Sequence, residues 1–102
     1  MKNSESLKKN KEFQVVYRTG TSYANKYLVM YVLKNQHNRN RLGISVSKKV
    51  GNSVVRHRVT RLVRESYRLN EDLFQTGYDM VVIARNSAAE RSFREIESAL
   101  LH

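Results

Sequence analysis

The arginines between residues 53 and 69 are the side chains whose type and spacing point most directly to a chemistry. Five of them recur at short intervals around one histidine, at Arg56, His57, Arg58, Arg61, Arg64 and Arg68. Glu65 is the single acid in this segment. A guanidinium keeps its charge and offers a rigid fork of N–H donors that suits phosphate oxygens. Cations without matched carboxylates predict a surface that binds a polyanion.

A helix over residues 53–69 is expected to turn most of these cations away from the core. At about 100° per residue, the apolar stripe consists of Val55, Val59, Leu62, Ser66 and Leu69. The opposite face consists of His57, Thr60, Arg61, Arg64 and Arg68, with Arg56 on one flank and Arg58 nearer the core boundary. Because this face lacks the Asn or Gln that commonly reads DNA bases, it favours recognition of backbone and shape. A merely solvated cationic face is the alternative.

Lys48 and Lys49 precede this helix, and Asn52 or Ser53 is expected to cap it. The two lysines add charge at the helix N-terminus, where free backbone N–H groups already favour an anion. We therefore include both lysines in the predicted anion-binding surface.

Three aromatic residues suggest a second surface. Phe13 and Tyr17 share one face of a helix predicted over residues 11–19, and Tyr31 lies on the following strand. If the helix packs on the sheet, the three rings converge, and exposed rings can stack unpaired bases for ~1–3 kcal/mol each. Placement of Phe13 in the core is the alternative.

Catalysis by side chains of this chain is not expected. His37, His57 and His102 have no second histidine or carboxylate at ligand spacing, and Glu71 and Asp72 are the only adjacent acid pair. The sequence also has no cysteine, which excludes disulfides and thiolate metal sites. We predict no catalytic residue and no metal ligand, and a standalone nuclease is disfavoured.

The first half of the chain predicts an arm, a helix and two strands. Residues 1–9 form an extended basic arm with Leu7 as its anchor. The helix over 11–19 is capped by Asn10 and ended by Gly20 at positive φ. One strand covers 23–34, and a polar turn leads to its antiparallel partner over 41–47. In that partner the small side chains of residues 43, 45 and 47 leave room for a close approach.

The second half predicts the arginine helix, a buried strand and a last helix. Residues 79–84 are nearly all apolar, as in the interior of a sheet. Ser92 and Glu95 form a capping box that opens the last helix, whose apolar stripe is Phe93, Ile96 and Leu100. That helix is expected to be short, since the sequence stops at residue 102. The order α-β-β-α-β-α predicts an α+β sandwich with helices packed on a small sheet.

Composition limits both the architecture and the partner. The chain of 102 residues fits a single domain, and 19 Lys and Arg against 9 Asp and Glu give a net charge of +10. Nucleic acid is the favoured polyanion, and an anionic membrane surface is the alternative. No apolar run approaches the ~20 residues of a membrane span, and the N-terminus lacks a signal-like stretch. We therefore expect a cytoplasmic protein with no membrane association.

The arginine segment and its surroundings resemble the bacterial ribonuclease P protein component. The family pattern K-K-x-G-x-A-V-x-R-N-R-x-K-R-x-x-R-E is matched at Lys48, Lys49, Gly51, Val54, Arg56, Arg58, Arg61, Arg64 and Glu65. The stretches LKKNKEFQVVYRTG, YANKYLVMYV and YDMVVIAR also resemble the family. This chain departs from the pattern at Ser53, at His57, where the family has Asn, and at Thr60, where it has Lys.

The resemblance implies a fold and a function that spacing alone does not. The fold is an α+β sandwich with an unusual left-handed βαβ crossover, formed by 41–47, the arginine helix and 79–84. The implied function is the protein subunit of ribonuclease P, an endonuclease that matures the 5′ end of precursor transfer RNA. Its RNA subunit is the catalyst and requires Mg²⁺. A similar fold occurs in a ribosomal protein, so an RNA-binding ribosomal protein or RNA chaperone is the alternative.

The resemblance also assigns the residues. The catalytic RNA would contact Lys48, Lys49, Arg56, His57, Arg58, Arg61, Arg64 and Arg68. Phe13, Tyr17 and Tyr31 would line the cleft for the single-stranded 5′ leader of the precursor. Anions such as sulfate or phosphate are expected to stabilise the folded protein by binding it preferentially.

Overall fold

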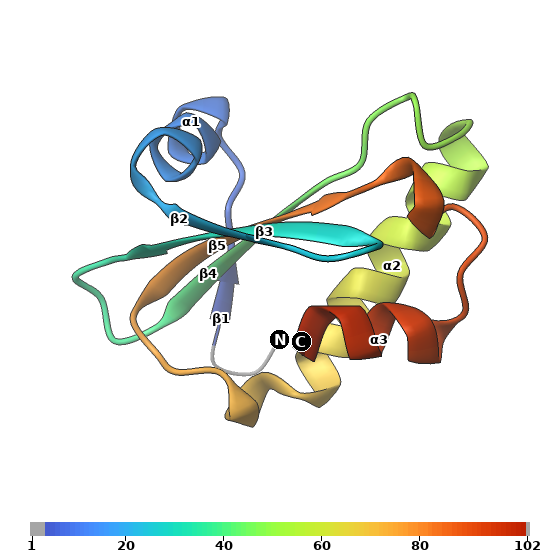
Figure 1. The fold of residues 1–102 in the computed structure, drawn as a ribbon. Coiled ribbons are helices and arrows are strands. Elements are labelled where there is room, and N and C mark those ends of the chain that lie inside the picture. The colour runs from blue at the N-terminus through green and yellow to red at the C-terminus, as the bar shows by residue number, and fades with distance from the viewer. Residues whose placement is uncertain (1–3, 102) are drawn as a thin grey trace.

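The structure, a computed structural model, describes residues 4–101 and places a mixed sheet between two layers of helix. Helix α1 lies on one face of the sheet, and α2 and α3 lie on the other (Figure 1). The elements are β1 (Ser4–Ser6), α1 (Asn10–Thr19), β2 (Thr21–Ala24), β3 (Leu28–Lys34), β4 (Asn40–Ser45), α2 (Ser53–Leu69), the 3-10 turn η1 (Glu71–Leu73), β5 (Tyr78–Ala84), the 3-10 turn η2 (Asn86–Ala88) and α3 (Phe93–Leu101). The predicted α+β class and the order of its elements are confirmed, with β1 as an additional short strand and the first predicted strand divided in two.

The strand order is β1-β4-β5-β3-β2, so β5 occupies the centre of the sheet. Strand β4 runs parallel to β1 and β5, whereas β3 runs antiparallel to β5 and β2. The predicted antiparallel pairing of 41–47 with the preceding strand is wrong, because β5 lies between them. The physical reason is burial: Val81 and Val82 point to opposite faces and are both fully buried, which requires a strand covered on both sides.

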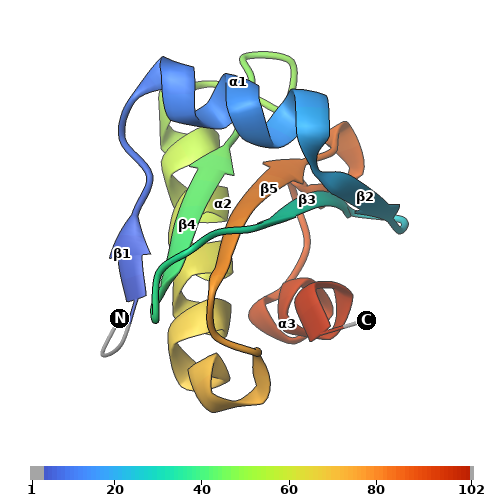
Figure 2. The same ribbon diagram turned by 90° about the vertical axis from the view of Figure 1, so that its left-hand side faces the viewer.

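The connection from β4 through α2 to β5 is a left-handed crossover. In Figure 2 both strands run upward, α2 passes behind the sheet, and β5 lies to the right of β4. Right-handed connections are the strong rule for parallel neighbours. The handedness implied by the family resemblance is therefore confirmed.

The predicted strand 23–34 is divided into a hairpin of β2 and β3. The Oδ1 atom of Asn25 accepts hydrogen bonds from the backbone N–H of Tyr27 (3.1 Å) and Leu28 (3.0 Å). A short polar side chain that bonds its own backbone competes with a continuous strand, and here it closes a turn. Along β3 neighbouring side chains alternate between layers: Tyr31 packs under α1, and Met30 packs toward the α2 layer.

Both predicted ends of α1 need correction. Lys9, not Asn10, is the N-cap residue, because the Glu12 carboxylate reaches back and accepts the N–H of Lys9 at 3.1 Å. Gly20 has φ −81°, not a positive φ. Glycine is required there for space, because a Cβ atom would lie 2.6 Å from the carbonyl oxygen of Val16.

Helix α2 begins as predicted, but its buried stripe ends on different residues. The Oδ1 atom of Asn52 accepts the N–H of Val55 at 3.0 Å and caps the helix. Leu69, predicted in the core, is 56% exposed. Tyr67 is fully buried instead, because its hydroxyl bonds Ser4 Oγ at 2.8 Å and its ring packs on Phe74. The core face of α2 therefore consists of Val59, Val63, Ser66 and Tyr67.

The two ends of the described chain largely match expectation. The N-terminal arm pairs with β4 as β1, and Leu7 is buried beside Val16, as its anchoring role predicted. The capping box of α3 is present, with Ser92 N–H to Glu95 Oε1 at 3.0 Å and Glu95 N–H to Ser92 Oγ at 3.3 Å. Residues 1–3 of the predicted arm and residue 102 lie outside the described residues.

An ion cluster joins α1, β4 and β5. Arg41 donates from Nε to Asp79 Oδ1 (2.8 Å), from Nη2 to Asp79 Oδ2 (2.6 Å) and from Nη1 to Glu12 Oε2 (2.8 Å). Asn35 Nδ2 also donates to Asp79 Oδ1 at 2.9 Å. Burial raises the pKa of Asp79, but the hydrogen bonds from Arg41 and Asn35 outweigh it and hold the pKa below its ordinary value.

We predict that the Asp79 carboxylate makes the free energy of unfolding fall in acid. Its folded pKa is below the unfolded value of about 3.9. Its contribution is therefore complete above about pH 4 and is lost as the pH falls through the folded pKa. Asp79→Asn should lower stability at pH 7 by about 3 kcal/mol, because it leaves Arg41 part-buried without its main partner.

The measurement is urea unfolding of both proteins between about pH 2 and pH 7. The difference between wild type and Asp79→Asn should shrink steadily below about pH 4. A difference that stays constant over this range would show that the carboxylate charge is not what Asp79 contributes.

Candidate nucleic-acid interface

Helix α2 presents its cations as the helical spacing predicted, except that Arg58, predicted nearer the core boundary, is exposed and the flanking Arg56 is the more buried of the two. His57, Arg58, Arg61, Arg64 and Arg68 are exposed on the helix, and Lys48 and Lys49 are exposed in the turn before it. Arg56 and Thr60 are partly buried. The Nε atom of Arg56 is buried with no hydrogen-bond partner in the described part of the chain. We call Lys48, Lys49, Arg56, His57, Arg58, Arg61, Arg64 and Arg68 the cationic face.

Two arginines of the cationic face have partners inside the protein. Arg68 forms an ion pair with Glu65, and this hydrogen bond lowers the pKa of Glu65. Arg58 donates from Nη1 to the carbonyl of Ala89 (3.2 Å) and from Nη2 to the carbonyl of Arg91 (2.7 Å). These hydrogen bonds tie the β5–α3 loop to α2. Because carbonyl oxygens carry no formal charge, they do not neutralise the guanidinium of Arg58.

Four other exposed side chains of the cationic face have no carboxylate within ion-pair distance in the described part of the chain. Within residues 4–101, the side chains of Lys48, Lys49, Arg61 and Arg64 form no ion pair or hydrogen bond. Like charges at helical spacing repel one another, at a cost that a bound polyanion removes. These four side chains are therefore the strongest candidates for phosphate contacts.

The three predicted aromatic residues meet on the opposite layer. The ring centroids of Phe13 and Tyr17 are 6.4 Å apart, and those of Tyr17 and Tyr31 are 5.2 Å apart, both edge to face. All three side chains are partly buried, so each keeps some exposed surface. We call them the aromatic row. The predicted convergence is confirmed, whereas a role in stacking bases stays a prediction.

Gly43 explains how Phe13 is seated. A Cβ atom at position 43 would lie 2.6 Å from the Cζ atom of the Phe13 ring. The room that small residues were predicted to leave on β4 is therefore occupied by this ring. Phe13 contacts the core cluster of Leu7, Val16 and Val81 and is not fully enclosed by it. Both interpretations of Phe13, core residue and exposed ring, apply in part.

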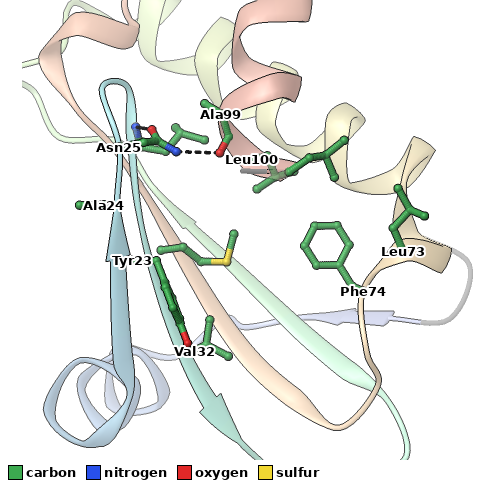
Figure 3. A pocket seen from close by; sticks show the side chains of 11 residues that line it. Tyr23, Ala24, Asn25, Val32, Leu73, Phe74, Ala99 and Leu100 are labelled. Carbon is green, nitrogen blue, oxygen red and sulfur yellow. Dashed lines mark hydrogen bonds between the residues drawn. The ribbon is translucent and has the colours of Figure 1, made fainter.

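A pocket on the face of the sheet opposite α1 is lined by uncharged side chains (Figure 3). It lies between the β2–β3 hairpin and the end of α3, with Tyr23, Phe74 and Leu100 among its lining residues. Asn25 closes one end by donating from Nδ2 to the carbonyl of Ala99 at 2.7 Å. None of the residues that line this pocket is an acid, histidine, lysine or arginine. The pocket therefore belongs to neither predicted surface.

Sequence reasoning missed the cluster of Arg41, Glu12 and Asp79. Its members come from α1, β4 and β5, and no local spacing relates them. The only local signal was a charged residue at the start of a strand that otherwise has a buried pattern.

No three His, Cys, Asp or Glu side chains in residues 4–101 gather closely enough to hold a metal ion. The helices of this region also include none long and apolar enough to cross a membrane.

The chain resembles proteins of one family along nearly its whole length. The family model described as Ribonuclease P matches residues 1–102. A ribonuclease P protein component from Lachnoclostridium phytofermentans is 61% identical over 99 residues, covering 97% of this chain and 85% of the relative. One from Clostridium botulinum is 61% identical over 97 residues, covering 94% of this chain and 87% of the relative.

Solved structures agree with the sequence relatives. The RNase P protein of Staphylococcus aureus is 39% identical with a TM-score of 0.88, covering 95% of this chain and 89% of that one. The RNase P protein of Thermotoga maritima is 33% identical with a TM-score of 0.88, covering 95% of this chain and 92% of that one. On the combined evidence of sequence, fold and the match over residues 1–102, this chain belongs to the ribonuclease P protein family.

Proposed function

We propose that the chain binds the catalytic RNA of ribonuclease P through the cationic face and the 5′ leader of precursor transfer RNA through the aromatic row. Membership of the family supports the role of a ribonuclease P subunit in transfer RNA processing. The observation that supports binding to the catalytic RNA is a set of exposed cations that form no ion pair or hydrogen bond within residues 4–101. They are Lys48, Lys49, Arg61 and Arg64.

The division of labour follows from the chemistry of the two surfaces. Guanidinium and ammonium groups contact phosphates of any sequence and release the counterions that RNA otherwise holds. Aromatic faces stack unpaired bases, which a 5′ leader has and a mature transfer RNA lacks at that end. The cationic face would hold the RNA subunit, and the aromatic row would favour precursor over product.

Mg²⁺ and the cleavage step are assigned to the RNA subunit in this proposal. Mg²⁺ prefers a set of oxygen ligands, and residues 4–101 bring together no group of three acids or histidines that would supply one. The protein would instead add positive charge to the complex. That charge lowers the Mg²⁺ concentration needed to bring negatively charged RNA strands together. Sulfate or phosphate would likewise stabilise the protein alone by occupying the cationic face.

A structural RNA-binding protein of the ribosomal kind, or an RNA chaperone, is the second candidate. It would use the same cationic face and would not distinguish a leader-bearing RNA from a mature one. Discrimination by the aromatic row therefore separates the two functions.

The double variant Arg61→Ala/Arg64→Ala should weaken binding to ribonuclease P RNA and reduce its dependence on salt. Removing one phosphate contact should reduce the slope of log K against log [salt] by about 0.7–0.9, so the double variant should reduce it by about 1.5. The melting temperature should hold, since neither side chain forms an ion pair or hydrogen bond within residues 4–101. Filter binding over a salt series measures the slope.

The matched control is Lys26→Ala/Arg94→Ala, which removes the same charge from exposed positions outside the cationic face. It should leave the slope near the wild-type value. Equal slopes for the two double variants would mean that net charge, not the cationic face, determines RNA binding.

Phe13→Ala should lower affinity for precursor transfer RNA about tenfold, as expected when one stacking interaction of ~1–3 kcal/mol is removed. Affinity for mature transfer RNA should be unchanged. Binding of both RNAs to the reconstituted holoenzyme measures the ratio. Phe93→Ala, which truncates a partly buried phenylalanine on α3, is the control for weakened packing alone. An equal loss of affinity for both RNAs would reduce Phe13 to a core residue.

A further inference from the structure

We infer that Arg41 is a positioning residue for leader binding, because its guanidinium fixes the first turn of α1 against the sheet and thereby sets the aromatic row. The inference rests on the proposed leader-binding function and adds a residue that the cationic face does not contain. Arg41 does not belong to the aromatic row either, so its effect would pass through α1.

The geometry makes Arg41 a bridge between layers. Two of its nitrogens engage both oxygens of Asp79 on β5, at 2.8 and 2.6 Å, and a third engages Glu12 on α1 at 2.8 Å. A bidentate contact fixes the plane of the guanidinium as well as its position. The hydrogen bond from the third nitrogen therefore holds the Glu12 carboxylate at one position relative to β5.

Glu12 passes this constraint to the ring next to it. Its carboxylate also accepts the backbone N–H of Lys9 at 3.1 Å, so it closes the start of α1 while it holds Arg41. Phe13 follows directly, and its ring lies on Gly43, two residues after Arg41 on β4. Residues 41 and 43 of one strand thus hold the helix start and the first ring of the row.

Burial separates this cluster from the other ion pairs of residues 4–101. The exposed fractions of the side chains are 8% for Asp79, 25% for Arg41 and 28% for Glu12. The pairs Arg39–Glu5, Arg68–Glu65 and Arg91–Glu95 are 38–56% exposed. Solvent screens exposed pairs, and long side chains move freely there, so they fix little geometry. Of the ion pairs in residues 4–101, those of the Arg41 cluster are the ones buried enough to define the position of α1.

Removal of the bridge should displace α1 without detaching it. Val16 is fully buried and Leu7 is 6% exposed, and both pack with Val81 beneath the helix. Leu7 precedes α1 and Val16 lies in its second half, so this apolar contact lies outside the first turn and does not involve Arg41. Without the bridge, the start of α1 and Phe13 gain freedom, while the cationic face on the opposite layer keeps its arrangement.

The test compares Arg41→Lys with Arg39→Lys in the reconstituted holoenzyme. Lysine keeps the charge but cannot engage Asp79 with two nitrogens and Glu12 with a third. Arg41→Lys should reduce the affinity ratio of precursor to mature transfer RNA about tenfold and leave the affinity for ribonuclease P RNA within about twofold. Arg39→Lys alters an exposed pair near the same strand and should change neither quantity.

A double-mutant cycle with Phe13→Ala tests the route of the effect. If Arg41 acts through the aromatic row, Arg41→Lys should cause no further loss of discrimination once Phe13 is alanine. Additive losses would mean that Arg41 contacts the leader directly, and an unchanged ratio in Arg41→Lys alone would mean that it positions nothing; either result overturns the inference. Glu12→Gln, which keeps an acceptor for the backbone N–H of Lys9, should reproduce the effect if Arg41→Lys folds poorly.

Failure of the inference differs from failure of the proposed function. If Phe13→Ala loses discrimination and Arg41→Lys does not, the aromatic row binds the leader without help from Arg41. If the wild-type holoenzyme does not prefer the precursor, or if Phe13→Ala leaves that preference intact, the proposed leader site itself is wrong. The inference then fails with it.

Discussion

The protein carries more positive charge than its own acids can neutralise. This excess constrains where the acids and the exposed cations lie in the structure. The chain carries 19 Lys and Arg against 9 Asp and Glu. Several of the acids stand where layers or turns join: Asp79 and Glu12 around Arg41, Glu95 at the start of α3, and Glu97, which accepts from Asn70 at the end of α2. The exposed cations of α2 are left largely without carboxylates. Acids thus maintain the framework, and five arginines of the surplus lie together on α2, where a polyanion can cover them.

The central strand keeps two unlike surfaces apart. Because β5 is buried on both faces, α1 and α2 must lie on opposite sides of the sheet, as Figures 1 and 2 show. The α1 layer exposes parts of three rings that touch edge to face, and the α2 layer exposes guanidinium and ammonium groups. One surface suits unpaired bases and the other suits phosphates. The proposed function, in which one subunit contacts two different RNAs, would use both.

Local features of the fold could be predicted from sequence, and non-local ones could not. The caps at Asn52 and at Ser92 with Glu95 depend on neighbouring residues and were confirmed. The place of β5 between β3 and β4 depends on pairing between distant segments, so the order of the sheet was missed. Arg41 shows the same limit in the candidate site, because its partners lie 29 and 38 residues away. The arginines of the cationic face were predictable because helical spacing alone places them on α2.

Cleavage of a precursor transfer RNA at low Mg²⁺ tests the central claim most directly. A bacterial ribonuclease P RNA would be assayed with and without this protein, at a Mg²⁺ concentration too low for the RNA to act alone. We predict that cleavage at the mature 5′ junction appears only when the protein is present. If the protein binds the RNA and cleavage is not restored, the claim that this chain is a functional ribonuclease P subunit is contradicted, and a structural RNA-binding role replaces it.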